Sequence, residues 1–300
     1  MVFSRELPHS FSEALRVCKE IISANHQLIR RNTVDTEAEL LVVGAYRAAG
    51  GGNITRAEFY SRLQDSFPEA AGERLLVLAG MRAQGFPLQH ALGFQIFLDH
   101  EYEVNASTLI PRPETEVLVT EVIQALKLPV LGIEIGLGTG VISIELLHRF
   151  TGLKMRASEL SVPAQALARK NAVRILGDDS RIEVLTPKDA SDVLGPFSGT
   201  RADFIVSNPP YLDAESAEEV DEEVLQHEPR AALFPEGGDP LHFYRQIASG
   251  AADLLSPGGQ VFLEVAHERA EATKALFQAP WRCRLINDLA GRPRVLIAEI

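Results

Sequence analysis

A glycine-rich turn is the first segment whose residue types and spacing could do chemistry. It consists of Glu134, Ile135, Gly136, Leu137, Gly138, Thr139 and Gly140. Such glycines let the backbone turn sharply and approach a ligand beside the amides of a helix N-terminus. Residue 141 is valine, so the last glycine of a dinucleotide fingerprint is missing. The acidic Glu134 would repel a pyrophosphate but suits a cationic amino group. The turn therefore fits S-adenosylmethionine better than NAD, and the alternative is a tight turn without a ligand.

A second acid, Glu159, ends the next predicted strand, about twenty residues further along the chain. An acid in this place commonly accepts hydrogen bonds from ribose hydroxyls. Its position after the glycine turn favours this role over that of a solvated strand-end carboxylate. We therefore expect Glu159 to bind the ribose of the cofactor.

A proline-rich loop follows the predicted strand 203–207 and reads Asn208-Pro209-Pro210-Tyr211. Its prolines fix φ and lack a backbone N–H, which leaves carbonyl oxygens free. With the Asn208 carboxamide they form a row of acceptors into which a planar NH₂ group could donate, and Tyr211 could form a flat wall. Ligands of parallel sheets bind beyond the carboxyl ends of strands, so a substrate site is favoured over a purely structural turn.

The composition is that of a globular protein in a reducing compartment. The apolar fraction is 46% and the charged fraction 23%, which excludes disorder and fibrous repeats for most of the chain. Two cysteines, Cys18 and Cys283, are too few for a disulfide framework or a cysteine zinc site, and we expect no metal. No apolar run approaches the roughly 20 residues of a membrane span, and residues 1–8 lack a secretory signal. We therefore expect a cytoplasmic protein with no membrane partner. The net charge of −12 disfavours direct nucleic-acid binding.

The first 86 residues are predicted to form helices. Capping-box patterns begin at Ser10, Thr36 and Thr55, and the glycines 50–52 are expected to end the second helix. A fourth helix is predicted over 69–84. This segment is either a structural helical bundle or a substrate-docking module. The alternating apolar residues between 94 and 104 then predict a β-hairpin at the joint between two domains.

Strands and helices alternate from about Glu114 to the end of the chain. The strands are predicted at 130–135, 153–159, 182–185, 203–207, 260–265, 282–286 and 295–300. This alternation predicts a mostly parallel sheet with helices on both faces. The short link between the last two strands predicts an antiparallel hairpin at one edge of the sheet.

In combination, these motifs resemble a known family. The Glu-x-Gly-x-Gly-x-Gly turn with Asn-Pro-Pro-Tyr is similar to class I S-adenosylmethionine-dependent methyltransferases that modify planar NH₂ groups. The segment 109–116, Leu-Ile-Pro-Arg-Pro-Glu-Thr-Glu, narrows the resemblance to the glutamine-N5 methyltransferases of peptide chain release factors. Further matches are Glu228-Pro229-Arg230, Gly237-Gly238-Asp239, Leu241, Phe243-Tyr244-Arg245 and Ala290-Gly291-Arg292.

The resemblance implies an α/β fold and a division into three parts. It implies a seven-stranded Rossmann-like class I methyltransferase sheet, with a small N-terminal helical domain joined by a β-hairpin. Residues 1–86 would be the substrate-docking domain, 87–112 the β-hairpin linker, and 113–300 the catalytic domain that binds S-adenosyl-L-methionine. The enzyme would methylate the side-chain amide nitrogen of the glutamine in the Gly-Gly-Gln motif of a release factor, its protein partner.

The resemblance also implies roles for individual residues. The turn 136–140 would hold the methionine portion of the cofactor together with Glu134, and Arg112 and Thr115 would lie close to the cofactor. Asn208 would border the cofactor as well and grip the glutamine amide with the Pro209 carbonyl. Pro210 and Tyr211 would complete this catalytic and substrate-binding loop. Transfer would be direct, without a histidine or cysteine nucleophile, and His227 and His267 are expected to be surface residues.

The sequence departs from the family pattern in a few places. Glu134 stands where the family often has Asp. After Glu264 the chain has Ala266 and Arg269 where the family often has Gly and Gln. Near the adenine the family has Asp beside a bulky residue, and Asp189-Ala190 is the counterpart here.

Other functions share parts of this pattern. A nucleic-acid methyltransferase acting on adenine N6 or guanine N2 would use the same Asn-Pro-Pro-Tyr chemistry. A ribosomal-protein glutamine methyltransferase and a non-enzymatic cofactor-binding scaffold are further alternatives. The chain itself contains Gly258-Gly259-Gln260, which follows Ser-Pro and enters a strand, so we interpret it as a turn.

Overall fold

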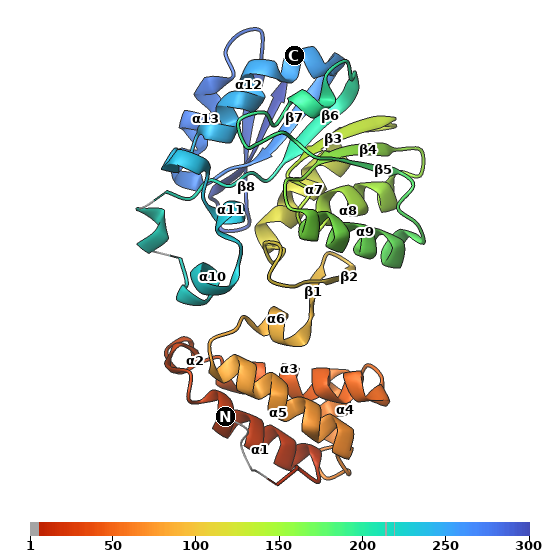
Figure 1. The fold of residues 1–300 in the computed structure, drawn as a ribbon, viewed down its shortest axis with the longest axis vertical. Coiled ribbons are helices and arrows are strands. Elements are labelled where there is room, and N and C mark those ends of the chain that lie inside the picture. Colours follow the sequence, from red (N-terminus) through yellow and green to blue (C-terminus); the bar gives the residue numbers. More distant parts are fainter. Residues whose placement is uncertain (1–5, 214, 219) are drawn as a thin grey trace. The chain divides into compact units, whose positions relative to one another are not determined.

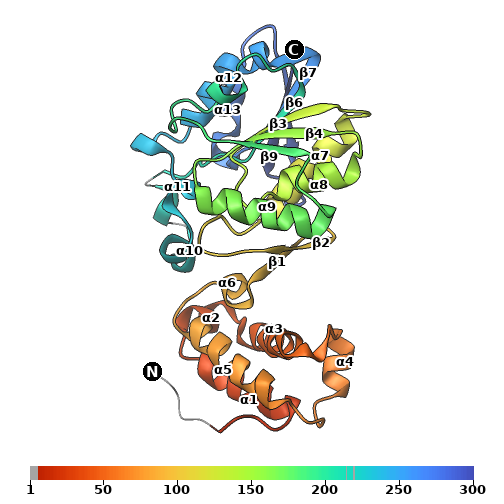
Figure 2. The same ribbon diagram turned by 45° about the vertical axis from the view of Figure 1, so that its right-hand side comes forward.

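The computed structural model describes residues 6–213, 215–218 and 220–300. The chain divides into two compact units, which meet in the sequence between Gly93 and Phe94. Figures 1 and 2 show the helical first unit and the α/β second unit. Of the segment 87–112, one short helix belongs to the first unit and a β-hairpin to the second.

The first unit is a helical bundle around its own apolar core. Its helices are α1 (Phe11–Ile22), α2 (His26–Arg31), α3 (Val34–Tyr46), α4 (Arg56–Ser61), α5 (Glu69–Ala83) and α6 (Leu88–Leu92), with a π-helical turn at Arg47–Gly51. Phe11 packs edge to face against Phe59 and Phe67 in this core. The Ser10 side chain caps α1, and Thr55 forms a full capping box with Glu58.

The capping box predicted at Thr36 is wrong. Helix α3 begins at Val34, two residues before Thr36, and its N-cap position is Thr33. The Glu37 amide bonds to the Thr33 carbonyl over 2.9 Å, and the Glu37 carboxylate accepts from the Thr33 hydroxyl over 3.0 Å. Glu37 also forms a buried ion pair with Arg82. Thr36 therefore lies inside the first turn of the helix, whose backbone hydrogen bonds begin at the Thr33 carbonyl, and it is not the cap. The predicted end of this helical segment near Gly50–Gly52 is confirmed, as Gly50 and Gly52 have left-handed φ values.

The second unit contains the predicted hairpin and a seven-stranded sheet. Its strands are β1 (Phe94–Phe97), β2 (His100–Glu103), β3 (Leu131–Ile135), β4 (Lys154–Ser158), β5 (Ile182–Leu185), β6 (Ala202–Ser207), β7 (Leu255–Glu264), β8 (Arg282–Asn287) and β9 (Pro293–Glu299). Its helices are α7 (Pro113–Ala125), α8 (Val141–Arg149), α9 (Val162–Leu176), α10 (Glu222–His227), α11 (Arg230–Leu233), α12 (His242–Leu254) and α13 (Ala270–Leu276).

The strand order of the large sheet is β5-β4-β3-β6-β7-β9-β8. Five strands run parallel, and β9 is antiparallel to both β7 and β8. This confirms the seven-stranded α/β prediction and the antiparallel pair at one edge. Strand β7 begins earlier than predicted because Leu255 pairs with Ala202, and the register with β6 shifts before Phe204. The Gly258-Gly259-Gln260 segment lies in this irregular part of the strand, where Gly258 has a φ of 77°.

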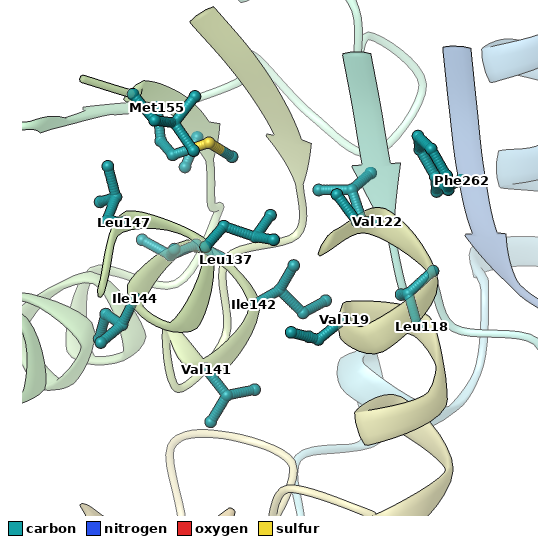
Figure 3. Close-up of a cluster of buried hydrophobic side chains, with 14 of the residues drawn as sticks. Leu118, Val119, Val122, Leu137, Val141, Ile142, Ile144, Leu147, Met155 and Phe262 are labelled. Atoms are coloured by element: carbon teal, nitrogen blue, oxygen red, sulfur yellow. The ribbon is translucent and has the colours of Figure 1, made fainter. Parts of the chain in front are cut away.

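Two apolar clusters cover the two faces of the sheet. One is formed by α7 and α8 against β4, β6 and β7, with Leu118, Ile142 and Met155 among its members (Figure 3). The other lies under α12 and contains Phe243 and Ile247. These layers hold the strand ends rigidly, so loops that leave the strands are well positioned for a site.

Among the residues that the structure describes, no helix is both long enough and apolar enough to cross a bilayer. The same residues contain no group of three or more His, Cys, Asp or Glu side chains placed to hold a metal ion.

Candidate active site

The two motifs lie at the carboxyl ends of neighbouring parallel strands. Strand β3 ends at Ile135 and β6 at Ser207, and these two residues are paired in the sheet. The Ser207 hydroxyl donates to the Ile135 carbonyl oxygen over 2.7 Å. Because β3 lies between β4 and β6, the order of the strands reverses here, which is where open α/β sheets bind ligands. The glycine turn and the Asn-Pro-Pro-Tyr loop therefore share one site.

The glycine turn has a backbone that side chains disfavour. Gly136, Gly138 and Gly140 have φ values of 80°, 54° and 87°. A Cβ atom on Gly138 would meet no atom within 4 Å. A Cβ atom on Gly140 would lie 3.0 Å from Ile144 Cδ1 and 3.2 Å from Ala168 Cβ. Gly138 thus leaves space at the surface of the turn, whereas Gly140 allows the following helix to pack closely.

The end of strand β4 braces this turn. The Leu137 amide donates to the Ser158 carbonyl oxygen over 2.9 Å. The Glu159 carboxylate accepts from the Gly138 amide over 2.9 Å and from the Ser161 amide over 2.8 Å. Glu159 therefore fixes the turn through backbone hydrogen bonds, and its carboxylate retains lone pairs for further donors.

Glu134 is a buried acid beneath the turn, with 1% of its surface exposed. Its Oε2 atom accepts from the Ser143 amide over 3.1 Å and from the Ser143 hydroxyl. Burial raises the pKa of Glu134 to about 8; the Ser143 hydrogen bonds oppose this shift, and the nearby Glu159 charge adds to it. A cationic ligand group would restore the charged form, so the site suits an ammonium or sulfonium group.

A chain of hydrogen bonds holds Asn208 in the second motif. Its Nδ2 atom donates to the Thr115 hydroxyl oxygen over 3.1 Å, and this hydroxyl donates to Glu264 Oε2 over 2.7 Å. The Tyr211 hydroxyl lies 3.4 Å from Glu264 Oε1. Only 1% of Glu264 is exposed, and burial raises its pKa to about 7, against the effect of the Thr115 hydrogen bond. The loop is therefore tied to helix α7 and to the end of β7.

A second buried acid holds the segment that precedes helix α7. Glu228 accepts from the Ile110 amide over 2.9 Å and forms an ion pair with Arg112 over 2.5 Å. Burial raises the pKa of Glu228, while the Arg112 charge lowers it. This pair joins two stretches that are more than a hundred residues apart in sequence, and it positions the Arg112 guanidinium beside the site.

The β-hairpin supports the glycine turn from below. The fully buried Asn171 of α9 donates to the carbonyl oxygens of Glu103 and Thr139, each over 3.1 Å, and accepts from the Glu103 amide over 2.8 Å. The Tyr102 hydroxyl donates to Glu145 of α8 over 2.8 Å. The hairpin is thus an integral part of the second unit, and the Asn171 side chain links it to the turn.

Two cavities meet at the Asn-Pro-Pro segment. The larger has a volume of about 320 Å³ and extends over the glycine turn, and the smaller, of about 190 Å³, extends toward Tyr211. The residues that line both are Leu109, Arg112, Asn208, Pro209, Pro210 and Ala232. The segment is therefore the shared wall of a two-chambered site.

Most of the predicted site residues line the larger cavity. These are Arg112, Thr115, Glu134, Gly136, Leu137, Gly138, Thr139, Glu159, Asn208, Pro209 and Pro210. Tyr211 lines only the smaller cavity. Gly140 lines neither, since it packs against the neighbouring helices. Asp189 also lies outside both cavities, and its carboxylate accepts from the Ser191 amide over 2.9 Å.

The sequence reasoning left other lining residues unassigned. Glu264 borders the smaller cavity. It ends strand β7, and its position near a strand end, which Glu134 and Glu159 share, was the sequence signal that could have identified it. Pro187, Val193 and Phe243 form an apolar part of the larger cavity, and the first two are close in sequence to the Asp189-Ala190 pair expected there. Their apolar side chains carried no chemical signal before the fold was known. Among the described residues, the cavity walls contain no histidine and no cysteine.

Comparisons with known proteins agree with this geometry. Residues 113–241 match the family described as "Methyltransferase small domain". The release factor glutamine methyltransferase of Moorella thermoacetica is 35% identical over 253 residues, which cover 82% of this chain and 86% of the relative. That of Cereibacter sphaeroides is 35% identical over 249 residues, with the same coverage.

A solved structure also matches the chain. It is the release factor-specific protein-(glutamine-N5) methyltransferase of Alicyclobacillus acidocaldarius, which is 30% identical. The match covers 66% of this chain and 98% of that chain, with a TM-score of 0.39. The identity and coverage of the Moorella and Cereibacter relatives decide the assignment: this chain belongs to the family of release factor glutamine methyltransferases.

Proposed function

We propose that this chain transfers a methyl group from S-adenosylmethionine to the side-chain amide nitrogen of the glutamine in the Gly-Gly-Gln motif of a peptide chain release factor. One observation carries the proposal: the Asn-Pro-Pro segment separates a cavity over the glycine turn from a second cavity beside Tyr211. A transferase needs its donor and acceptor on opposite sides of one reacting point. The two chambers supply this arrangement.

The larger cavity fits the cofactor in shape and in charge. A Cβ atom on Gly138 would enter open space there, so the turn leaves room for a ligand close to the backbone. The acids Glu134 and Glu159 line the same cavity, and they suit a cationic amino group and ribose hydroxyls respectively. When bound, S-adenosylmethionine supplies an electrophilic methyl group on its sulfonium.

The smaller cavity would bind the acceptor amide. An amide nitrogen is a poor nucleophile because its lone pair is delocalised into the carbonyl. Acceptance of both NH₂ protons by Asn208 Oδ1 and the Pro209 carbonyl oxygen would orient the nitrogen and stabilise the positive charge that develops on it. Tyr211 would form a flat wall for the amide plane, and Pro210 would keep the loop rigid. We assign no general base, and the proton leaves to water.

The test is methyl transfer by the full chain to a purified release factor, with the modified residue mapped by mass spectrometry. We expect a single methyl group on the glutamine of Gly-Gly-Gln and none on a release factor in which that glutamine is alanine. Ribosomal proteins and nucleic acids with exposed amino groups serve as competing acceptors in parallel reactions. Faster modification of either would overturn the assignment of the release factor.

We further propose that the enzyme works in the cytoplasm and binds no nucleic acid directly. Residues 1–93 contain ten basic and ten acidic residues, so the net charge of −12 belongs to residues 94–300. An acidic catalytic unit repels a phosphate backbone. Filter binding of labelled tRNA and rRNA fragments at low salt tests this, and tight binding would contradict it.

The first unit is proposed to dock the folded release factor. It has its own apolar core, and all residues that line the two cavities come from the second unit. Contacts far from the reacting amide can contribute binding energy that orients it. This docking role is the one that the sequence predicts for residues 1–86. The sequence predicts the catalytic role for residues 113–300.

A chain that begins at Phe94 tests the docking role. This chain keeps the hairpin contacts of Asn171 and Glu145. We expect it to retain its cofactor affinity but to lose at least about tenfold in kcat/KM on an intact release factor. A short Gly-Gly-Gln peptide should be methylated equally by both chains. Equal rates on the intact release factor, with a folded circular dichroism spectrum, would show that the helices are only structural.

A further inference from the structure

The hydrogen bonds behind Asn208 have a defined direction. When Glu264 is ionised it can only accept, and its side-chain partners Thr115 and Tyr211 are hydroxyls that can donate. Thr115 has one proton, which it gives to Glu264 Oε2 over 2.7 Å. Its oxygen is then left as an acceptor, and it receives the Nδ2 group of Asn208 over 3.1 Å.

This direction determines which end of the Asn208 carboxamide is free. Because Nδ2 is bonded to Thr115, Oδ1 is the end that remains available to the cavities that Asn208 lines. In the reversed orientation, Oδ1 would face a Thr115 oxygen without a proton to offer. The NH₂ group of Asn208 would then face the NH₂ group of the acceptor glutamine, and two donors cannot form a hydrogen bond with each other.

We infer that Thr115 and Glu264 are positioning residues that hold the Asn208 carboxamide with its oxygen toward the acceptor amide. The inference rests on the proposed function and adds a basis for specificity to it. An oxygen held in this place accepts from the NH₂ group of glutamine and repels the carboxylate of glutamate. Both residues are buried, with 3% of Thr115 and 1% of Glu264 exposed, so competition from water is small.

The same geometry argues against a direct role of the Thr115 hydroxyl in binding the cofactor. Thr115 lines the larger cavity, but its hydroxyl is already engaged as donor to Glu264 and as acceptor from Asn208. A substitution that removes the hydroxyl should therefore affect the transfer step more than cofactor affinity.

The experiment compares Thr115→Val, which removes the hydroxyl at nearly constant volume, with Thr115→Ser, which keeps it. Single-turnover rates are measured with the full chain, saturating S-adenosylmethionine and an intact release factor. We expect Thr115→Val to be about tenfold slower than wild type, the effect of one buried hydrogen bond, and Thr115→Ser to stay within about threefold. The cofactor Kd of both variants should stay within about threefold of wild type.

A double variant distinguishes positioning from a general structural effect. If Thr115 acts through Asn208, then Thr115→Val should not slow a chain that already carries Asn208→Ala. An equal slowing in both backgrounds would overturn the inference, as would a loss of cofactor affinity that matches the loss of rate. Thr115→Ala, which favours the helix, replaces Thr115→Val in the same cycle if the valine variant does not fold.

A binding measurement on the wild-type chain completes the test. Release factor with Gly-Gly-Gln should bind at least about tenfold more tightly than the same factor with Gly-Gly-Glu, because the carboxylate has no proton for Asn208 Oδ1. Equal affinities would overturn the inference. A wild-type chain that methylates no release factor would overturn the proposed function instead, so the two failures are distinguishable.

Discussion

The glycine turn and the Asn-Pro-Pro-Tyr loop leave neighbouring strands but are built in opposite ways. The turn owes its shape to missing side chains, with positive φ at Gly136, Gly138 and Gly140. The loop owes its shape to two prolines and to the hydrogen bonds of one side chain, Asn208. The turn presents open space above its backbone to a ligand, and the loop presents acceptor oxygens.

Each motif has its own buried acid. Glu134 lies beneath the turn and bonds to Ser143 at the start of α8, so its partner is near in sequence. Glu264 lies behind the loop and reaches Asn208 through Thr115, which is 149 residues away from Glu264 in sequence. The comparison indicates that the buried acid of the proposed cofactor half has its partner close in sequence, whereas the proposed acceptor half is assembled from segments more than ninety residues apart.

The largest expected effect comes from filling the space over the turn. In Gly138→Val, the side chain must either stand in the cavity or force residue 138 out of its left-handed conformation, and both remove the binding surface. We expect the affinity for S-adenosylmethionine to fall by at least about 10³-fold, to below detection by calorimetry.

Gly199→Val is a matched control for this variant. Gly199 also has a positive φ, of 76°, with nothing within 4 Å of an added Cβ atom, but it lines neither cavity. It should carry the backbone strain and keep its cofactor affinity. Unchanged affinity in Gly138→Val would remove the turn from the cofactor site.

A smaller effect is expected when the acceptor half is altered alone. Asn208→Ala removes one acceptor oxygen and leaves the glycine turn intact. The single-turnover rate should fall on the order of 10²-fold, as for the loss of one preorganised hydrogen bond in a transition state, while the cofactor Kd changes by less than about threefold. A rate close to wild type would mean that Asn208 only shapes the loop.

The same contrast explains what could be predicted from the sequence. The glycine turn was predictable because glycine spacing and the preceding strand define it locally, and the seven strands were found because apolar runs alternate with helices. The Asn208–Thr115–Glu264 connection was not, since its three members lie on segments that only the sheet topology brings together. Thr115 was expected near the cofactor, and the structure gives its hydroxyl two partners on the acceptor side.

Two features of the structure could not be predicted from local sequence patterns. The box pattern at Thr36 is a valid cap in isolation, but the helix already begins at Val34, so Thr36 lies within its first turn. The apolar wall of Pro187, Val193 and Phe243 carries no chemical signature, so its role depended on knowing the cavity. The sequence therefore identified the motifs that carry polar groups, but it did not identify the cavity surfaces that are defined only by their shape.

The smallest expected effect is a change of cofactor affinity with pH, which distinguishes the two buried acids Glu134 and Glu264. Burial raises the pKa of Glu134 to about 8, so it is mostly protonated at pH 6 and increasingly ionised toward pH 7.5. A cationic ligand group binds the ionised form better. We expect the affinity for S-adenosylmethionine to rise by up to about tenfold between pH 6 and pH 7.5. Without cofactor the sign is reversed for stability. A folded pKa above the unfolded value of 4.5 stabilises the fold below pH 4.5, and this contribution is lost as pH rises through about 8.

Two variants with neutral side chains test whether the rise in cofactor affinity with pH comes from Glu134 beneath the glycine turn. Glu134→Gln cannot ionise, so its cofactor affinity should be nearly flat over the same pH range, and its stability advantage over wild type should grow as the pH is raised. Glu264→Gln removes a second carboxyl whose pKa burial raises, to about 7, but Glu264 borders the proposed acceptor cavity, so this variant should keep the wild-type rise in affinity. Calorimetric titrations at four pH values, paired with thermal melts, measure both quantities. If Glu264→Gln flattens the affinity profile and Glu134→Gln does not, then the acids serve the opposite motifs, and the division of the site into a local cofactor half and an assembled acceptor half is wrong.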